Sequence, residues 1–525
     1  MLLFAYAMCS HAAVWTTSGY TGFVPEKPEL ENVSVSPDGI VTLAPRSVEK
    51  ATLDESSVWA ITEAPGRRVY VGTGNCGRVY LLQPGANPRV VFDADAGQVL
   101  CLTTDRQGNV YFVTSPGGIV YRMAPTGNPV QLCSTGEEYV FDILSGPSGE
   151  LYCATGINGR LYHIPPSGKP EVVFVAAQAH LTALAWLVEG KELLVGTSPG
   201  GIVYRLQFQP GKARPEASVL YDTPKDEVRA LAVAGSGLVA IAANPDEAGE
   251  SAAGVFCVTT DGALRWNWTC PESTVFDLLY RSGHLLVATG TNGIIFELDS
   301  LGHAALLRKV PAQSVVCLEP GAEAVLCGTI GPCHVYALGQ DFASEGYIIA
   351  GPHDCAGPAR FGRLSVRSTV PAGTALLFDT RSGDAEEPDS TWTEWQETSE
   401  FVRSPSGRFV QWRARLYSNF PALTPRLQQI DLYYCIPNRP PLITKFDVTV
   451  VNLADARAGK ADPVRSLSWE LSDPDSDSLA LEVLFSRDDY TGRWQTLAKD
   501  LAGTGYELDT RMLPDGWCRF KLVAS

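Results

Sequence analysis

Seven short apolar runs in the chain are each preceded by one polar residue. These residues are Ser57, Gln98, Tyr139, His180, Glu227, Thr274 and Ser314. Histidine is the residue type most often used as a general base, so His180 could take that role beside Glu227, Tyr139 and the nearby Arg229. Such residue types would suit a lyase or a hydrolase, if the fold gathers them at one place. One histidine in seven positions does not favour a metal centre.

The seven runs recur because the chain is built from repeats. The clearest unit is VYVGTGNCGRVYLL, Val69 to Leu82, which reads as two strands around a turn rich in Gly and Asn. Its Thr recurs at Thr73, Thr114, Thr155, Thr197, Thr289 and Thr329, with Ala243 in the remaining unit. Each unit offers four strands in about 40–47 residues, and seven such units predict a seven-bladed β-propeller over residues 30–344. A strand near Ile40 to Leu43 is expected to close the ring, as the outer strand of the last blade.

Propeller geometry predicts where the seven polar residues lie. The connection that enters the innermost strand of a blade and the connection between its second and third strands emerge on the same face. The polar residues should therefore form a ring at one mouth of the central channel, surrounded by the Gly-rich hairpins. Three interpretations compete for this ring: a solvated channel mouth, a site for a ligand or partner, and a catalytic site at His180 and Glu227.

Two carboxylates are expected inside the propeller. Asp142 and Asp277 lie two residues into innermost strands, where other units have Ala or Cys. A buried carboxylate needs hydrogen-bond partners, so water or backbone amides should lie beside each. A polar link between neighbouring blades is favoured over a functional role.

Two further β domains are expected after the repeats end. Residues 345–437 alternate short strands with acidic and Pro-rich turns, a pattern typical of a β-sandwich. A stiff linker follows at residues 438–441. Residues 442–525 offer six strands of a sandwich like fibronectin type III, which normally needs a seventh, so we expect an incomplete module with an open edge. The predicted fold class is all-β throughout.

The motifs together resemble those of a group of exported bacterial seven-bladed β-propeller proteins with WD-repeat-like or quinoprotein-like repeats. The marks of the resemblance after the repeats are Thr380-Arg381-Ser382-Gly383, Trp392 with Trp395, and the strand from Arg408 to Arg413. The resemblance implies the same architecture, with a C-terminal β-sandwich and a fibronectin type III-like module. It implies no particular activity. The Gly-His and Trp-Asp pairs of true WD repeats do not recur in this chain.

The first residues predict export. Residues 1–13 resemble a signal peptide, with an apolar core and a small-x-small cleavage site at Ser10-His11-Ala12, although no basic residue precedes the core. We therefore expect a periplasmic or extracellular protein, and no later stretch is long enough to form a transmembrane segment. Two cysteine pairs could form disulfides, Cys317 with Cys327 and Cys355 with Cys435. Burial as small apolar side chains is favoured for most cysteines.

The net charge of the chain argues against one class of function. The 525 residues carry a formal net charge of -17 at pH 7, which argues against a protein that grips nucleic acid. We expect a non-enzymatic binding or scaffold protein of the cell envelope or exterior, which engages a protein or a glycan through the channel mouth. The alternative is a lyase or hydrolase at that mouth, around His180 and Glu227.

Other residues suggest minor sites. Asp473, Asp475 and Asp477 are spaced like the start of a Ca²⁺ loop, but the Gly and Glu of an EF-hand are missing. An expanded hairpin also carries Asp246, Glu247 and Glu250. For both loops a solvated turn is favoured, and no cofactor is expected. Trp392, Trp395 and Trp412 could stack on sugars, although core packing is favoured for them.

Overall fold

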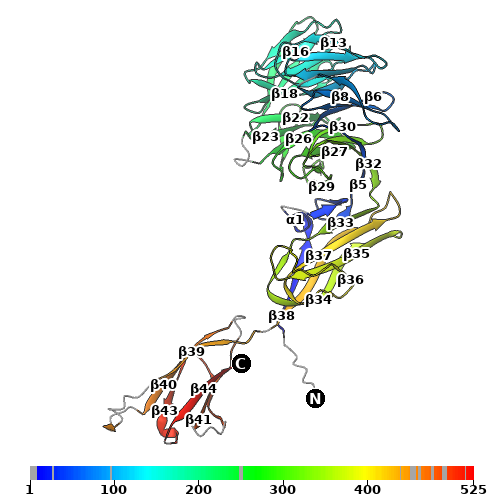
Figure 1. The fold of residues 1–525 in the computed structure, drawn as a ribbon. Coiled ribbons are helices and arrows are strands. Elements are labelled where there is room, and N and C mark those ends of the chain that lie inside the picture. Colours follow the sequence, from blue (N-terminus) through cyan, green and yellow to red (C-terminus); the bar gives the residue numbers. More distant parts are fainter. Residues whose placement is uncertain are drawn as a thin grey trace.

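The computed structural model describes residues 9–25, 29–94, 97–246, 252–437, 439–449, 457–458, 463–473, 478–487, 493–514 and 516–525. The described chain is almost entirely β-sheet, which confirms the predicted fold class. Its short helices are α1 (Gly19–Phe23) and the 3-10 helix η1 (Thr510–Met512). In these residues no helix combines the length and the apolar character that crossing a bilayer requires. Figure 1 shows a propeller, a middle sandwich and a third β module.

Seven groups of four antiparallel strands form the blades of the propeller. Blade 1 contains β6 (Val58–Ala64), β7 (Arg68–Thr73), β8 (Arg78–Leu82) and β9 (Arg89–Asp93). Blade 2 contains β10 (Gln98–Thr104), β11 (Val110–Ser115), β12 (Ile119–Met123) and β13 (Pro129–Ser134). Blade 3 contains β14 (Val140–Ser145), β15 (Leu151–Thr155), β16 (Arg160–Ile164) and β17 (Glu171–Val175). Blades 4 and 5 are β18 (His180–Val188), β19 (Glu192–Ser198), β20 (Ile202–Gln207), β21 (Glu216–Asp222); β22 (Glu227–Val233), β23 (Val239–Asn244), β24 (Gly254–Val258), β25 (Leu264–Thr269). Blades 6 and 7 are β26 (Val275–Arg281), β27 (His284–Thr289), β28 (Ile294–Leu298), β29 (Ala304–Lys309); β30 (Ser314–Pro320), β31 (Val325–Ile330), β32 (His334–Phe342), β5 (Pro45–Thr52).

The recurring Thr has a structural role in the hairpins. Its hydroxyl donates a hydrogen bond across the Gly-rich turn, for example from Thr155 to the Arg160 carbonyl (2.7 Å) and from Thr289 to the Ile294 carbonyl (2.7 Å). Both side chains are fully buried. The turn itself needs glycine, because a Cβ on Gly159 (φ 56°) would lie 2.0 Å from a backbone oxygen. The geometry of this turn therefore explains why the Thr and the Gly recur in successive blades.

The ring closes with a strand from the N-terminal part of the chain. β5 pairs with β32 as the outer strand of blade 7, and innermost strands β30 and β6 lie next to each other. The predicted closing strand, Ile40 to Leu43, is therefore wrong by several residues. That segment contains β4 (Val41–Leu43), which pairs with β3 (Val33–Val35) and with the sandwich instead.

The β3–β4 hairpin joins the propeller to the middle sandwich. β3 pairs with β29 of blade 6, and β4 pairs with β38 (Arg426–Pro437) of the sandwich, so one continuous sheet crosses the boundary between the domains. The apolar side chains of both hairpin strands are fully buried. Arg308 of β29 is buried there too, and its guanidinium donates to the Pro45 carbonyl and to Asn32. Burial lowers the pKa of Arg308.

The middle sandwich contains N-terminal strands as well as the predicted residues 345–437. Its strands are β1 (Cys9–Ser18), β2 (Glu29–Glu31), β33 (Glu345–Ile349), β34 (His353–Thr369), β35 (Thr374–Gly383), β36 (Gln396–Thr398), β37 (Gly407–Ser418) and β38. β1 pairs along β38, and Trp15 stacks on His353 at 4.7 Å between ring centroids. The expected leader, residues 1–13, overlaps β1, so its boundary does not coincide with a structural boundary. Residues 1–8 lie outside the described residues.

The third module has the six predicted strands. They form two three-stranded sheets: β39 (Leu442–Val448), β40 (Val464–Ser472) and β43 (Gly505–Asp509); β42 (Gln495–Leu501), β41 (Leu481–Arg487) and β44 (Cys518–Ala524). Leu467, Trp469 and Val483 are buried between the sheets. Within the described residues β44 lies at the edge of its sheet, where an open edge is predicted. Similarity to fibronectin type III stays a prediction.

The two expected disulfides are absent from the described residues. Cys317 and Cys327 are free and buried, because they pack in different apolar clusters on opposite sides of blade 7. Cys355 is also a free buried thiol, whereas Cys435 is disulfide-bonded. Most described cysteines serve as small buried side chains, as favoured from the sequence, and burial raises the pKa of Cys327 to about 12.

Candidate functional site

The seven predicted ring residues lie together at one end of the innermost strands. Gln98, His180, Glu227 and Ser314 begin their strands, and Ser57, Tyr139 and Thr274 directly precede theirs. The hairpins lie on the same face, because the amides of Gly74, Gly156 and Gly290 donate to the carbonyls of Ser57, Tyr139 and Thr274. The predicted placement is therefore found. A binding role for the ring stays a prediction.

A second ring lies just inside the polar one, and the sequence reading missed it. Each innermost strand shifts register by one residue directly after the apolar residue that follows its ring residue, and the skipped residue does not pair with the neighbouring strand. A β-bulge of this kind redirects a side chain. The skipped residues are Trp59, Leu100, Phe141, Thr182, Arg229, Phe276 and Val316. All except Thr182 and Val316 are partly exposed.

His180 is held by the neighbouring hairpin. Its Nδ1 accepts a hydrogen bond from the Ile157 amide (3.1 Å), and the Phe141 ring meets the imidazole edge to face, with centroids 5.6 Å apart. A neutral imidazole that accepts at Nδ1 carries its proton on Nε2. In this arrangement His180 has no free basic nitrogen, so it is not poised to act as a general base.

Glu227 has other partners. Its carboxylate accepts from the Asn244 side-chain amide (3.3 Å) and lies 3.9 Å from the Arg229 guanidinium, which in turn lies 5.9 Å from the centre of the Phe276 ring. Across the described residues, no hydrogen bond or ion pair joins His180 to Glu227. The geometry therefore does not assemble the acid–base pair that the lyase or hydrolase alternative requires.

Asp142 and Asp277 tie neighbouring blades together, as predicted. Asp142 accepts from the Leu184 amide of blade 4 (2.7 Å), and Asp277 accepts from the Leu318 amide of blade 7 (2.8 Å). Each carboxylate also accepts from the next amide of its own strand. Burial raises the pKa of Asp142 to about 7 and that of Asp277 to about 6, and Arg229 opposes both shifts.

The tryptophans of the sandwich do not offer a stacking platform. Trp412 is buried in the core, and Trp392 is almost as buried, with its indole N–H donating to the Ala385 carbonyl (3.0 Å). Trp395 is partly exposed, but the guanidinium groups of Arg381 and Arg413 lie 4.5 and 4.8 Å from its ring centre. The proposed sugar-stacking surface is therefore wrong, because these rings are already covered by protein.

The two acidic loops fall largely outside the described residues. Asp246 and Asp473 are described, whereas Glu247, Glu250, Asp475 and Asp477 are not. Within the part of the chain that the structure describes, no group of three or more His, Cys, Asp or Glu side chains is arranged to hold a metal ion. The Ca²⁺ sites stay predictions.

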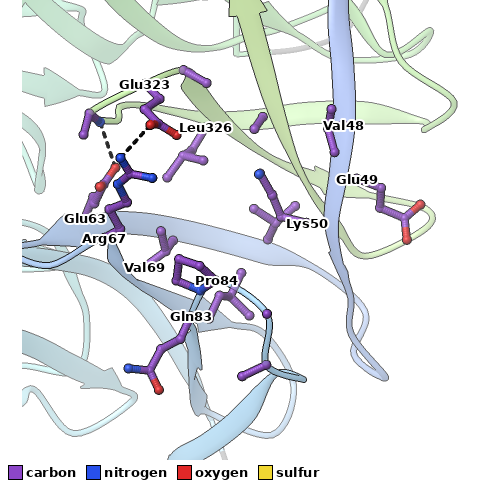
Figure 2. Close-up of a pocket in the computed structure, with 17 residues that line it drawn as sticks. Val48, Glu49, Lys50, Glu63, Arg67, Val69, Gln83, Pro84, Glu323 and Leu326 are labelled. Carbon is purple, nitrogen blue, oxygen red and sulfur yellow. Dashed lines mark hydrogen bonds and ion pairs between the residues drawn. The ribbon is translucent and has the colours of Figure 1, made fainter.

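The opposite face of the propeller carries hollows at the seams between blades. One of about 370 Å³ lies where the ring closes, between blades 7 and 1. Its walls include Val69, Leu82, Leu326, Val335 and Ala337. Figure 2 shows Lys50 extending from β5 into this space, while Glu49 turns away from it. Three further hollows lie on this face at other seams. Sequence reasoning directed attention to the hairpin face and missed them.

Comparison with known proteins identifies no family for this chain and adds no function. No family model matches the chain, and no curated protein matches it. Among solved structures, a streptogramin B lyase is 11% identical over 56% of this chain and 98% of its own, with a TM-score of 0.47. A virginiamycin B lyase from Staphylococcus aureus is 13% identical over 57% and 99%, with a TM-score of 0.46. The WD40 repeats of RRP9 are 9% identical over 57% and 99%, with a TM-score of 0.48.

Proposed function

We propose that this chain is a binding protein that engages a protein partner through the channel mouth on the hairpin face. The observation that carries the proposal is the second ring, in which β-bulges direct Trp59, Phe141, Arg229 and Phe276 to the mouth and leave them partly exposed. Aromatic side chains and Arg dominate the energetics of protein interfaces. The adjoining Tyr139 stacks on Phe141, with ring centroids 6.0 Å apart, and extends this surface outward.

A strained residue on the same face supports the proposal. Ile157 is 49% exposed and has φ 71°, a left-handed conformation that is a true outlier for a β-branched residue. Asn75 takes the equivalent place in blade 1 with φ 66°, at less cost, because Asn tolerates this region. Thr291 takes the same place in blade 6 with φ 78°, so the conformation belongs to the turn, and the exposed apolar side chain is what distinguishes Ile157. An exposed apolar side chain held beside Tyr139 and His180 suits a contact with a partner.

The frame around the mouth is rigid, which favours binding. Glu137 is buried and accepts hydrogen bonds from Asn158, Arg160 and Tyr162 of the blade 3 hairpin. Glu55 does the same for Arg78 and Tyr80 in blade 1. Because these polar groups are already paired, the hairpins lose little conformational freedom when a partner binds.

The test compares two faces of one protein. Envelope extract is passed over the wild type, over the mouth variant Tyr139→Ser with Ile157→Asn, and over the control Leu301→Ser, which changes a side chain 68% exposed at the opposite face. We expect the mouth variant to retain less than about a tenth of the bound partner and the control to retain it all. Equal retention by all three would contradict the proposal. Loss of retention after glycosidase treatment would identify a glycan instead.

We propose further that the chain works after export, in the periplasm or outside the cell. The support is the disulfide at Cys435, since disulfides persist in oxidising compartments. The buried free thiols are compatible with this, because burial keeps the thiols of Cys101, Cys153 and Cys317 protonated and inaccessible. Alkylation of native-source protein under denaturing conditions tests it, and reduction should release two additional thiols. No increase on reduction would contradict the proposal.

A further inference from the structure

The seam between blades 7 and 1 differs from five of the other six seams at one position of the outer strand. The outer strand of a blade has a bulge, where one residue is skipped in the pairing, and this residue packs against the next blade. In five of the other six blades it is apolar: Val91, Leu132, Val173, Leu220 and Leu307. Each belongs to the apolar cluster shared with the following blade.

In blade 7 the skipped residue is Lys50. β5 pairs Ala51 with Val335 and Glu49 with Tyr336, so the exposed Lys50 takes the position that an apolar side chain has in five of the other blades; in blade 5 the skipped residue is Arg265. The hollow of about 370 Å³ described above lies beside Lys50. This volume lies within the range of small-ligand pockets.

The charged groups around the hollow leave Lys50 as the unpaired cation. Arg67 is paired with Glu323 at 2.6 Å, and Glu63 accepts from the Ala322 amide at 3.0 Å (Figure 2). Glu49, from the other side of β5, accepts from Thr52 and lies 3.6 Å from the His334 ring nitrogen. Among the described residues none forms an ion pair or a hydrogen bond with Lys50.

We propose that this seam binds a small carboxylate with an apolar body. The apolar part would lie against Val69, Leu82 and Leu326, where five of the other seams hold an aliphatic side chain. The carboxylate would accept from the Lys50 ammonium, a charge-assisted hydrogen bond. Because the ligand would touch both β5 and blade 1, it would bridge the two segments whose association closes the ring and would raise the melting temperature.

Titration calorimetry on the full chain tests the proposal with octanoate and 4-phenylbutyrate as probes and with octanamide as the uncharged comparison. We expect saturable binding of the carboxylates and at least about tenfold weaker binding of octanamide. Lys50→Met keeps the length of the side chain and removes its charge, and it should weaken carboxylate binding by a similar factor. Lys212→Met, a change at an exposed loop lysine of blade 4, is the matched control and should leave binding unchanged.

Three results would overturn the proposal. The first is that neither carboxylate binds the wild type. The second is that octanamide binds as tightly as octanoate, which would remove the role of the charge. The third is that Lys50→Met binds as the wild type does, which would place the ligand elsewhere. Retention of a partner at the channel mouth is unaffected by Lys50→Met, so failure here is distinguishable from failure of the proposed function.

Discussion

The hairpin face and the seam that closes the ring on the opposite face differ in how their charged groups are paired. On the hairpin face, buried carboxylates such as Glu137 accept several hydrogen bonds from the neighbouring hairpin, and His180 accepts from a backbone amide. On the opposite face, at the seam where the ring closes, an ammonium group stands over apolar walls with its neighbours paired to one another. On the hairpin face these polar groups are therefore paired within the protein. At the closing seam, the Lys50 ammonium has no partner among the described residues.

This difference separates two kinds of recognition. A rigid frame that presents partly exposed aromatic rings suits a broad contact with a folded partner, in which few groups reorganise. A hollow with one unpaired cation suits a small molecule that supplies the missing apolar volume and the missing charge. Substitutions in the channel wall test whether its buried carboxylates stabilise the fold. Substitutions of Lys50 test whether the seam lacks an apolar side chain.

The largest effect is expected from breaking a link in the channel wall. Asp277→Ala leaves the amides of Leu278 and Leu318 without their acceptor, which costs about 1–3 kcal/mol for each buried group. At pH 5, we expect the free energy of unfolding to fall by about 3 kcal/mol in urea titrations followed by tryptophan fluorescence. The exposed Asp54→Ala is the control and should change stability little. Equal stability of Asp277→Ala and wild type would show that the link is not needed.

The pH dependence of the same group should follow its raised pKa. Burial raises the pKa of Asp277 from its ordinary 3.8 to about 6, so the folded protein holds this proton up to about pH 6 and the unfolded chain releases it near pH 3.8. The folded state therefore binds more protons between these values, so the stability that Asp277 contributes is present below pH 4 and is lost as pH rises through 6. Relative to Asp277→Asn, the wild type should lose about 2 kcal/mol from pH 4 to pH 6. A constant difference between the two proteins would contradict the shift.

The propeller could be predicted from sequence because its signals are local. The Gly-rich hairpins, the buried Thr and the apolar innermost strands repeat within each blade, so the ring, its polar residues and the Asp links followed. The N-terminal strands could not be predicted in the same way. The expected leader overlaps the start of β1, and the partner of β1, β38, lies more than four hundred residues away. No local pattern specifies such a pairing.

The second ring and the Lys50 seam can be located only when the register of the strands is known, and the sequence pattern did not reveal that register. Some innermost strands have three successive apolar residues where a strand should alternate, as in Val58-Trp59-Ala60, and this was the available sign of a bulge. β5 (Pro45–Thr52) is polar and half-exposed, so it did not stand out as a strand. Without its register to β32, Lys50 could not be compared with Leu132 or Leu307.

A smaller effect is expected from filling the seam. Lys50→Leu supplies the apolar side chain that five of the other seams have, and partial burial of a leucine should stabilise the fold by about 1 kcal/mol. Thermal unfolding of Lys50→Leu beside Lys212→Leu measures the difference without any ligand. If Lys50→Leu is no more stable than the wild type, the seam is not short of apolar contact, and the contrast between the two faces is lost.

The smallest effect is expected at Ile157, a β-branched residue held at φ 71° on the hairpin face. Ile157→Asn introduces the residue that blade 1 has at the same place, and it keeps the backbone amide that donates to His180. Because Asn accepts a positive φ more readily than a β-branched residue, stability should rise by about 0.5–1 kcal/mol. Partner retention should fall at the same time, since the exposed apolar side chain is gone. A rise in stability with unchanged retention would mean that the Ile157 side chain does not contact the partner. The aromatic residues of the second ring would then account for the binding.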